Sequence, residues 1–473
     1  GRLQATEVDA SRLHGAALPT RLAGTLAFSA DAASQSLTAD LSDRSRKVPL
    51  ALKLEAGVRD EVVRVPQFAL TAGEARANGQ GELQLAEPRR FAAELRLDRF
   101  DPSHWVRSEA LPPAQVSARV EVKGALLPEL GGTAQLRIED GSRWNGQSLG
   151  GHGELVFAGM RVTRADAALN AGNNRLTAKG AFGRPGDKLD FDLDAPRLQT
   201  LSSLLNGRLS ARGSLGETLD APVLDMTLDA GDLQLPGGVR VGKVQGRTSL
   251  GGSPVNGKRP QGGFAAAPAD IDLRIDNVAV SSAPQATMSH ATLRLQGTMA
   301  RHEGAVDAEF APADRSAPAT LAIRFDGGWG AGPGRGALSG WRGKVGQLEL
   351  ARAPLGMSLE APVELSYVPA AAAPQWQWEV GPAGIVLRLP GGQTGKLVNE
   401  GARGGGGRWE SRGRAEGLAW APEILLEALG GKPIPRERII VLDADWDMRF
   451  AGSLQGAANI RRRSGDLWVP GTP

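Results

Sequence analysis

The chain has 473 residues, and its 55 basic and 52 acidic side chains leave a net charge of only +3. It contains no cysteine, which excludes disulfides, thiol redox pairs and thiolate metal sites. So small a charge on so long a chain does not indicate a nucleic-acid binder, and no run of about 18 apolar residues predicts a transmembrane helix.

The dominant pattern along the chain is an alternation of apolar and polar residues with a period of two. It is clear at Val48–Glu55, at Phe91–Asp98 and at Val116–Lys123, and it returns at Leu189–Asp194. Successive side chains of a strand point to opposite faces. The pattern therefore predicts half-buried antiparallel strands with one apolar face and one charged face.

The same alternation continues to the end of the chain, at Ile271–Ile275, Leu321–Phe325 and Leu442–Phe450. Turns rich in Gly, Asn, Asp and Pro separate the strands, and we expect on the order of two dozen strands. Helix signals are few. Leucine spacing predicts helices at Arg197–Gly207 and Leu418–Gly430, and Ser103–Val106 predicts a short helical turn.

Stretches rich in Gly, Pro and Ala predict long loops. We expect one of them, residues 251–269, to separate an N-terminal part (1–250) from its continuation (270–473), which carries Gly-rich loops at 327–340 and 391–407. The stretches are Gly251–Ala269, Ala311–Ala319, Gly327–Gly340, Pro369–Pro374 and Gly391–Gly407.

The apolar faces can be buried in several closed sandwiches or in one elongated, curled sheet. The alternation runs from about Leu22 to about Leu467 without a change of class, which favours an all-β fold with one long, mostly antiparallel sheet. Its apolar positions are mostly small and aliphatic. A closed core usually needs bulkier filling, so these residues suit an open trough, although an alanine-rich composition explains them equally well.

Four passages of turn and strand carry a resemblance to a known family. One contains Asn206–Gly216 followed by Asp220–Leu224, which resembles the recurrent pattern G-x-L-x-A-x-G-x-L-G…P. The passages are Leu198–Leu228, Ala291–Phe310, Trp341–Pro362 and Ala444–Leu467. In their order and joint occurrence they resemble the TamB family, the inner-membrane-anchored subunit of the translocation and assembly module. AsmA-like relatives share its architecture.

The resemblance implies a curled sheet with an apolar inside that bridges the periplasm between the inner and outer membranes. The implied roles are phospholipid transport and support of outer-membrane protein assembly and secretion with a TamA-type barrel. The family's membrane helix and C-terminal domain are not recognisable, so we expect a central fragment. Its inner-membrane anchor and its partner contacts would lie outside the fragment.

We expect acyl chains of phospholipid to contact the inward strand residues, because exposing lipid to water costs about 0.8 kcal/mol per CH₂ group. We expect no catalytic residue, no cofactor and no metal, and therefore do not expect an enzyme. We also expect no nucleic-acid partner. The predicted lining residues are Leu50, Leu52, Leu54, Val120, Val122, Leu136, Ile138, Phe191, Leu193, Leu273, Ile275, Ile323, Phe325, Trp446 and Phe450.

Other patterns could indicate a metal or phosphate site, but each also fits ordinary solvent-exposed residues. His290 and His302 could form a metal pair, although solvated histidines are the favoured reading. The aspartates at 190, 192 and 194, and those at 443, 445 and 447, could bind calcium, but each set is better explained as the wet face of a strand. No Gly-Lys-Ser/Thr motif follows Gly404–Gly407, so this run predicts a loop and not a phosphate site.

Two further features stay open between readings. Arg461–Arg463 could contact anionic lipid, but a solvated strand edge is favoured. Trp376 and Trp378 would face the same side, either against acyl chains or as core anchors. The main alternative function is a structural or adhesive secreted scaffold that binds no lipid. A polysaccharide-active enzyme is disfavoured, because the aspartate sets lack flanking aromatic residues on the same face.

Overall fold

A computed structural model gives the fold. It describes residues 1–13, 15, 17–106, 108, 110–251, 263–281, 286–312, 318–331, 338–353, 355–369, 376–389, 392–420 and 440–465. Within these ranges, 30 strands belong to one antiparallel sheet that curls without closing into a barrel. The predicted all-β class and the curled antiparallel sheet are therefore confirmed, with more strands than expected.

The chain forms two compact units. The first comprises Gly1–Leu219 and Leu228–Pro236, and the second comprises Asp220–Thr227 and Gly237–Pro473. Strand β16 (Ala221–Leu235) contributes to both. The sequence-based division at residues 251–269 stays a prediction.

The described part of the first unit contains fifteen strands besides its part of β16, one α-helical turn and two 3₁₀ turns. These are β1 (Arg2–Val8), α1 (Ala10–Leu13), β2 (Leu22–Ala30), β3 (Ser34–Asp43), β4 (Leu50–Arg59), β5 (Val62–Ala72), β6 (Ala75–Gln84), β7 (Arg90–Phe100), η1 (Pro102–His104), β8 (Ala114–Ala125), β9 (Gly131–Ile138), β10 (Arg143–Trp144), β11 (Gln147–Ala158), β12 (Arg161–Ala171), β13 (Asn174–Phe182), β14 (Lys188–Ala195), η2 (Leu198–Thr200) and β15 (Asn206–Thr218).

The described part of the second unit contains fourteen further strands and one 3₁₀ turn. These are β17 (Val239–Leu250), η3 (Gly263–Ala266), β18 (Pro268–Val280), β19 (Ala286–Thr298), β20 (His302–Pro312), β21 (Ala319–Ala331), β22 (Leu338–Arg352), β23 (Leu355–Leu359), β24 (Val363–Val368), β25 (Gln377–Val380), β26 (Ala383–Leu389), β27 (Gln393–Gly405), β28 (Arg408–Trp420), β29 (Ile440–Ala451) and β30 (Leu454–Ser464).

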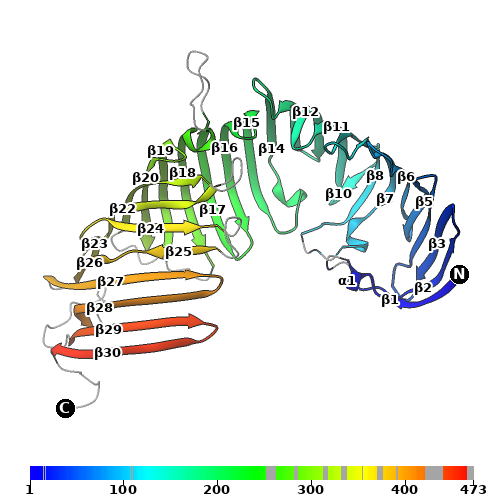
Figure 1. Ribbon diagram of the computed structural model, residues 1–473. Helices are drawn as coiled ribbons and strands as arrows, with labels where there is room; N and C mark the ends of the chain where they lie inside the picture. The colour runs from blue at the N-terminus through cyan, green and yellow to red at the C-terminus, as the bar shows by residue number, and fades with distance from the viewer. Residues whose placement is uncertain are drawn as a thin grey trace. The chain divides into compact units, whose positions relative to one another are not determined.

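Strands that follow one another in the chain pair with one another. In the first unit β1 to β9 pair in succession, β9 pairs with β11, and the succession continues to β15. The short β10 pairs with β8 and β11. Figure 1 shows the same consecutive arrangement in the second unit from β27 to β30, coloured orange to red.

Besides the small branch at β10, the succession of the described strands branches at β22 in the second unit. Its first half (Trp341–Val345) pairs with β24, and its second half (Glu349–Arg352) pairs with β23. Strand β23 then pairs with β26 and β24 with β25, and both branches rejoin on β27. The short pairs β23–β26 and β24–β25 thus lie between the long strands β22 and β27. These short strands account for part of the difference between the expected and the observed number of strands.

A hydrophobic cluster of the first unit lies at one end of its strands. Leu50, Ala72 and Ala75 form a buried cluster there, and Val48 and Trp105 pack against it. Trp105 comes from the loop after η1, and its carbonyl accepts a hydrogen bond from the Leu18 N–H, at 3.0 Å. Connecting loops therefore cover this end of the apolar face, which we call the closed end.

Asp43 fastens the loops at the closed end. Its side chain is only 1% exposed. Its carboxylate accepts hydrogen bonds from the Arg21 N–H (2.8 Å), the Ser45 N–H (3.0 Å) and the Ser45 hydroxyl (2.6 Å). Burial acts to raise the pKa of Asp43, but these bonds outweigh it and hold the pKa below the ordinary value of 3.8.

Gly151 in β11 provides a test of how closely these strands approach. Its φ is +133°, and a Cβ atom there would lie 2.1 Å from the Ala168 carbonyl oxygen. We expect Gly151→Ala to destabilise the first unit by about 1–3 kcal/mol in urea unfolding. Gly153→Ala is the matched control, because a Cβ at Gly153 meets nothing closer than 3.8 Å. Equal unfolding midpoints for the two variants would contradict the expectation.

The helix predictions fared unevenly. The short turn at Ser103–Val106 is present as η1 (Pro102–His104), capped by the Asp101 side chain. The helix at Arg197–Gly207 is wrong: only the 3₁₀ turn η2 forms, with Leu198 and Thr200 buried, and β15 begins at Asn206. The prediction at Leu418–Gly430 is wrong for Leu418–Trp420, which end β28, and its remainder lies outside the described residues.

Two predicted glycine-rich loops are largely strand. Residues 327–331 and 338–340 belong to β21 and β22, and 393–405 form β27, which leaves Gly406 and Gly407 as the turn. The reason is steric. A Cβ on Gly327 would lie 2.5 Å from the Trp341 ring, and one on Gly404 would lie 2.7 Å from the Trp378 ring. These glycines make room for aromatic side chains on neighbouring strands.

The other predicted loops are only partly described. The stretch at Gly251–Ala269 includes η3 and the start of β18, and Ala311–Ala319 reaches into β20 and β21. Residues 252–262, 313–317 and 370–375 lie outside the described residues.

Candidate functional site: the apolar face of the sheet

The strand register of the first unit lines up apolar residues into rows that cross the sheet. One row begins at Leu54 and passes through Phe68, Gly79, Leu95, Val120, Leu136, Gly153, Ala167, Ala178, Phe191 and Gly213. Directly opposed residues of an antiparallel pair share a face. The row therefore lies on one face from β4 to β15, and it contains no charged residue.

A second row runs parallel to the first. It contains Leu41, Leu52, Leu70, Ala77, Leu97, Ala118, Ile138, Gly151, Leu169, Leu176, Leu193 and Ala211. Leu50 and Val122 lie on the same face, since they alternate with Leu52 and Val120 along their strands. The structure thus brings all nine predicted lining residues of the first unit onto one continuous surface.

This surface is accessible. Leu50, at the closed end, is buried, whereas the other eight predicted residues are half-buried. Leu155 and Leu176, on the same face, are each 38% exposed. Within the described residues there is one sheet and the longest helix has four residues, so no second layer covers the face. A contiguous exposed apolar surface of this kind marks an interaction site.

The second unit repeats the arrangement. One row contains Leu273, Leu293, Val306, Ile323 and Leu348. The next contains Ile275, Ala291, Ala308, Leu321 and Leu350, and Phe325 lies on the same face beside them. The register places Trp446 and Phe450 of β29 on this face as well. The six predicted lining residues of the second unit therefore also share one face.

At one end of these strands the apolar face becomes aromatic. Opposed residues join Trp329 to Trp341, Trp341 to Tyr367, Tyr367 to Trp378, and then, across Gly404, Trp409 to Phe450. We call the six residues Trp329, Trp341, Tyr367, Trp378, Trp409 and Phe450 the aromatic ladder. The sequence pattern predicted Phe450 as a lining residue and placed Trp378 on one side with Trp376, but it did not single out Trp329, Trp341, Tyr367 or Trp409, although glycines flank Trp329 and follow closely after Trp341.

Rings of the ladder and its neighbours lie over glycines of adjacent strands. Trp378 covers Gly404 and Trp341 covers Gly327; beside them, Trp446 covers Gly413 and Phe325 covers Gly304. Trp409 and Phe450 stack at 6.2 Å between ring centroids. An aromatic ring shields the exposed backbone of a cross-strand glycine. The rings therefore cover the backbone of the neighbouring strands. They remain accessible to a ligand, since Trp409 is 38% exposed and Tyr367 is 40% exposed.

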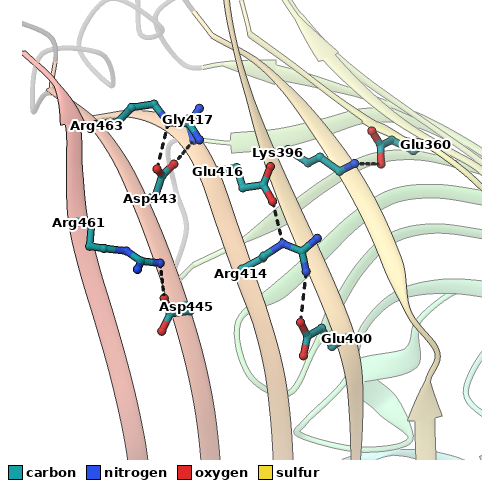
Figure 2. Close-up of polar contacts among 10 residues, drawn as sticks. All are labelled: Glu360, Lys396, Glu400, Arg414, Glu416, Gly417, Asp443, Asp445, Arg461 and Arg463. Atoms are coloured by element: carbon teal, nitrogen blue, oxygen red, sulfur yellow. Dashed lines mark hydrogen bonds and ion pairs between the residues drawn. The ribbon is translucent and has the colours of Figure 1, made fainter.

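The opposite face is charged, and its side chains form ion pairs within and between strands. Figure 2 shows this for the second unit, where Arg414 lies between Glu400 (3.3 Å) and Glu416 (2.7 Å) and Lys396 contacts Glu360 (2.7 Å). The hydrogen bond between Arg414 and Glu416 raises the pKa of Arg414 and lowers that of Glu416. Both groups thus stay charged, so this face of the sheet remains solvated.

The two aspartate sets lie on this charged face. Asp443 accepts hydrogen bonds from the Gly417 N–H (2.8 Å) and from Arg463 (3.0 Å), and Asp445 pairs with Arg461 (3.0 Å), as Figure 2 shows. The Gly417 N–H is the main reason that the pKa of Asp443 is lowered. Arginines of the run Arg461–Arg463 thus neutralise neighbouring carboxylates.

The first aspartate set behaves in the same way. Asp190 pairs with Lys188 at 2.7 Å, and Asp192 accepts a hydrogen bond from Arg212 at 2.7 Å. Among the described residues, no group of three or more acidic or histidine side chains is arranged to hold a metal ion. Both sets are the wet face of strands.

The structure does not bring His290 and His302 together. His290 contacts Asp276 at 2.7 Å and opposes Glu309 near the far end of β20, whereas His302 begins that strand. His302 is 4% exposed. Its Nε2 accepts from the Trp341 indole (2.9 Å) and its Nδ1 faces the Thr298 carbonyl (3.0 Å), so the proton lies on Nδ1. His302 therefore anchors a rung of the aromatic ladder.

Charged side chains line two hollows of the surface. One of about 490 Å³ in the first unit is lined by Arg64, Glu82, Glu94, Glu121 and Lys123. The apolar face offers an open surface instead of an enclosed pocket. A ligand of that face would therefore lie along the sheet with one side toward solvent.

Comparison with known families agrees with this architecture. A family model described as "TamB, N-terminal domain" matches residues 23–374. The chain belongs to the TamB family. No curated protein and no solved structure matches it. The expected position as a central fragment stays a prediction.

Membership in the TamB family assigns the chain to the cell envelope. TamB proteins are anchored to the inner membrane, span the periplasm, and relate to lipid transport and assembly with TamA. Within the described part of this chain, no helix has the length and apolar character needed to cross a bilayer.

Proposed function

We propose that the apolar face carries the acyl chains of phospholipids between the inner and outer membranes, and thereby supports outer-membrane protein assembly and secretion with a TamA-type barrel. The observation that carries this proposal is the pair of uninterrupted apolar rows across the first unit, which are open to solvent. Burying acyl chains there recovers about 0.8 kcal/mol per CH₂ group.

The mechanism is passive sliding. Adjacent strands lie about 4.8 Å apart, so a chain that moves from one strand to the next exchanges one set of aliphatic contacts for a similar set. Headgroups stay in water at the open side of the face. The protein makes and breaks no covalent bond in this process, and its ionised side chains serve solubility on the opposite face.

The alternative is a structural or adhesive scaffold whose apolar face binds no lipid. Native mass spectrometry of the gently purified chain, with lipid extraction in parallel, distinguishes the two. Several phospholipids per chain would support the proposal that the apolar face is a lipid conduit, a surface along which phospholipids move. A lipid-free, monodisperse protein that unfolds cooperatively would overturn it in favour of the scaffold.

A further inference from the structure

The apolar face of the second unit differs between the two ends of its strands. The aromatic ladder lies near the end at which β21, β24, β27 and β29 finish and β22, β25, β28 and β30 begin. Toward the other end the same face is aliphatic, with Leu321 on β21 and Leu442 on β29. A ligand that lies along the strands therefore meets different chemistry at its two ends.

The ladder also offers hydrogen-bond donors. The indole N–H groups of Trp329, Trp378 and Trp409 make no hydrogen bond with any described residue, in contrast to Trp341 and Trp446. Tryptophan combines an apolar ring with one polar donor, so it favours the boundary where hydrocarbon meets polar groups. The ester oxygens of a phospholipid lie at that boundary.

Basic side chains stand at the same end. A hollow of about 920 Å³ is lined by Trp329, Trp341, Arg301 and Arg342, among others. Arg301 and Arg342 are exposed, and neither has an ion pair with a described residue. Arg342 alternates with Trp341 along β22 and therefore projects from the charged face, so this positive charge lies at the rim of the ladder end and not on the apolar face itself.

The dimensions suit a lipid. Trp329 and Leu321 are eight residues apart on β21, about 26 Å at roughly 3.3 Å per residue. One leaflet of a bilayer provides about 15 Å of hydrocarbon. An acyl chain with its ester at the ladder therefore fits on the aliphatic part of the same strands.

We propose that the second unit holds phospholipids in one orientation, with their polar ends at the aromatic ladder and their acyl chains directed toward Leu321 and Leu442. This inference rests on the proposed function and adds a direction to it. The lipids would then move across the strands side by side, each headgroup passing from one rung of the ladder to the next.

Photo-crosslinking tests the orientation. The full chain is loaded with two-chain phospholipid probes that carry a diazirine either beside the ester or at the end of one acyl chain, and labelled peptides are mapped by mass spectrometry. We expect the ester-side probe to label Trp409 and Phe450 about fivefold more than the chain-end probe does, a preference that one net hydrogen bond supports. The chain-end probe should prefer Leu442–Trp446.

A double variant separates donors from apolar surface. Trp378→Leu/Trp409→Leu keeps the face apolar but removes two indole donors, so we expect equal labelling of the ladder region by both probes. Unselective labelling of the wild-type apolar face, or an unchanged preference in this variant, would overturn the orientation while leaving the conduit intact. Labelling confined to the charged face would overturn the conduit itself.

Discussion

Leu136→Arg is expected to empty the apolar face of the first unit of most of its co-purifying phospholipid. Leu136 lies in the middle of a row, between Val120 and Gly153. An arginine within hydrocarbon costs about 3 kcal/mol, which corresponds to roughly a hundredfold loss of occupancy at that point. The measurement is lipid per chain by native mass spectrometry.

Gln135→Arg is the matched control. It adds the same side chain to the next position of β9, which faces the charged side and is exposed. We expect wild-type lipid content and an unchanged unfolding midpoint in urea. If both variants carry as much lipid as the wild type, the apolar rows are not where lipid binds.

Asp43→Asn is expected to cause the largest loss of stability among single changes on the polar side chains of the first unit. The carboxylate is buried and accepts three hydrogen bonds, and an amide in its place turns a donor toward the Arg21 or Ser45 N–H. A buried hydrogen bond to a charged group contributes about 1.5–3 kcal/mol. Urea unfolding at neutral pH should show a loss of that size.

The pH dependence follows from the lowered pKa of Asp43. A carboxylate with a pKa that is lower in the folded state stabilises the fold above its ordinary pKa of 3.8 and loses this effect as the pH falls through the folded value. The difference between wild type and Asp43→Asn should therefore be constant above about pH 5 and shrink in more acidic solution.

Asp40→Asn serves as the control for Asp43. Asp40 is on the same strand, but its side chain is 65% exposed and its contact with Lys53 spans 3.4 Å. An exposed pair of this kind contributes less than about 1 kcal/mol. A loss of stability in Asp40→Asn equal to that in Asp43→Asn would show that the buried hydrogen bonds at Asp43 are not the cause.

Much of this fold could be predicted because the alternation of apolar and polar residues follows directly from strands that have one apolar face and one charged face. Leu50, Leu52 and Leu54 were placed correctly on one face from their spacing alone. That Leu54, Val120 and Phe191 fall into a common row could not be predicted, since the row depends on register between strands that the spacing does not contain.

Glycine was the main source of error. In Gly327–Gly340 and Gly391–Gly407 it predicted loops, whereas Gly327 and Gly404 are strand positions that accommodate Trp341 and Trp378. Glycine is required at these positions by a tryptophan on the neighbouring strand, so the residues next to it in the sequence do not reveal the requirement. The leucines of Arg197–Gly207 misled for a related reason, because Leu198 is buried by the packing of a turn and not by a helical stripe.

The consecutive pairing of β1 to β9 has a consequence for how such a chain can change in length. From β1 to β7 each strand bonds only to the strands before and after it in the chain, so its contacts have low contact order and its stability depends on nearest neighbours. A hairpin can then be inserted or deleted without disturbing register elsewhere. The branches at β8 and at β22, where two strands share one neighbour, are places where such a change would not be neutral.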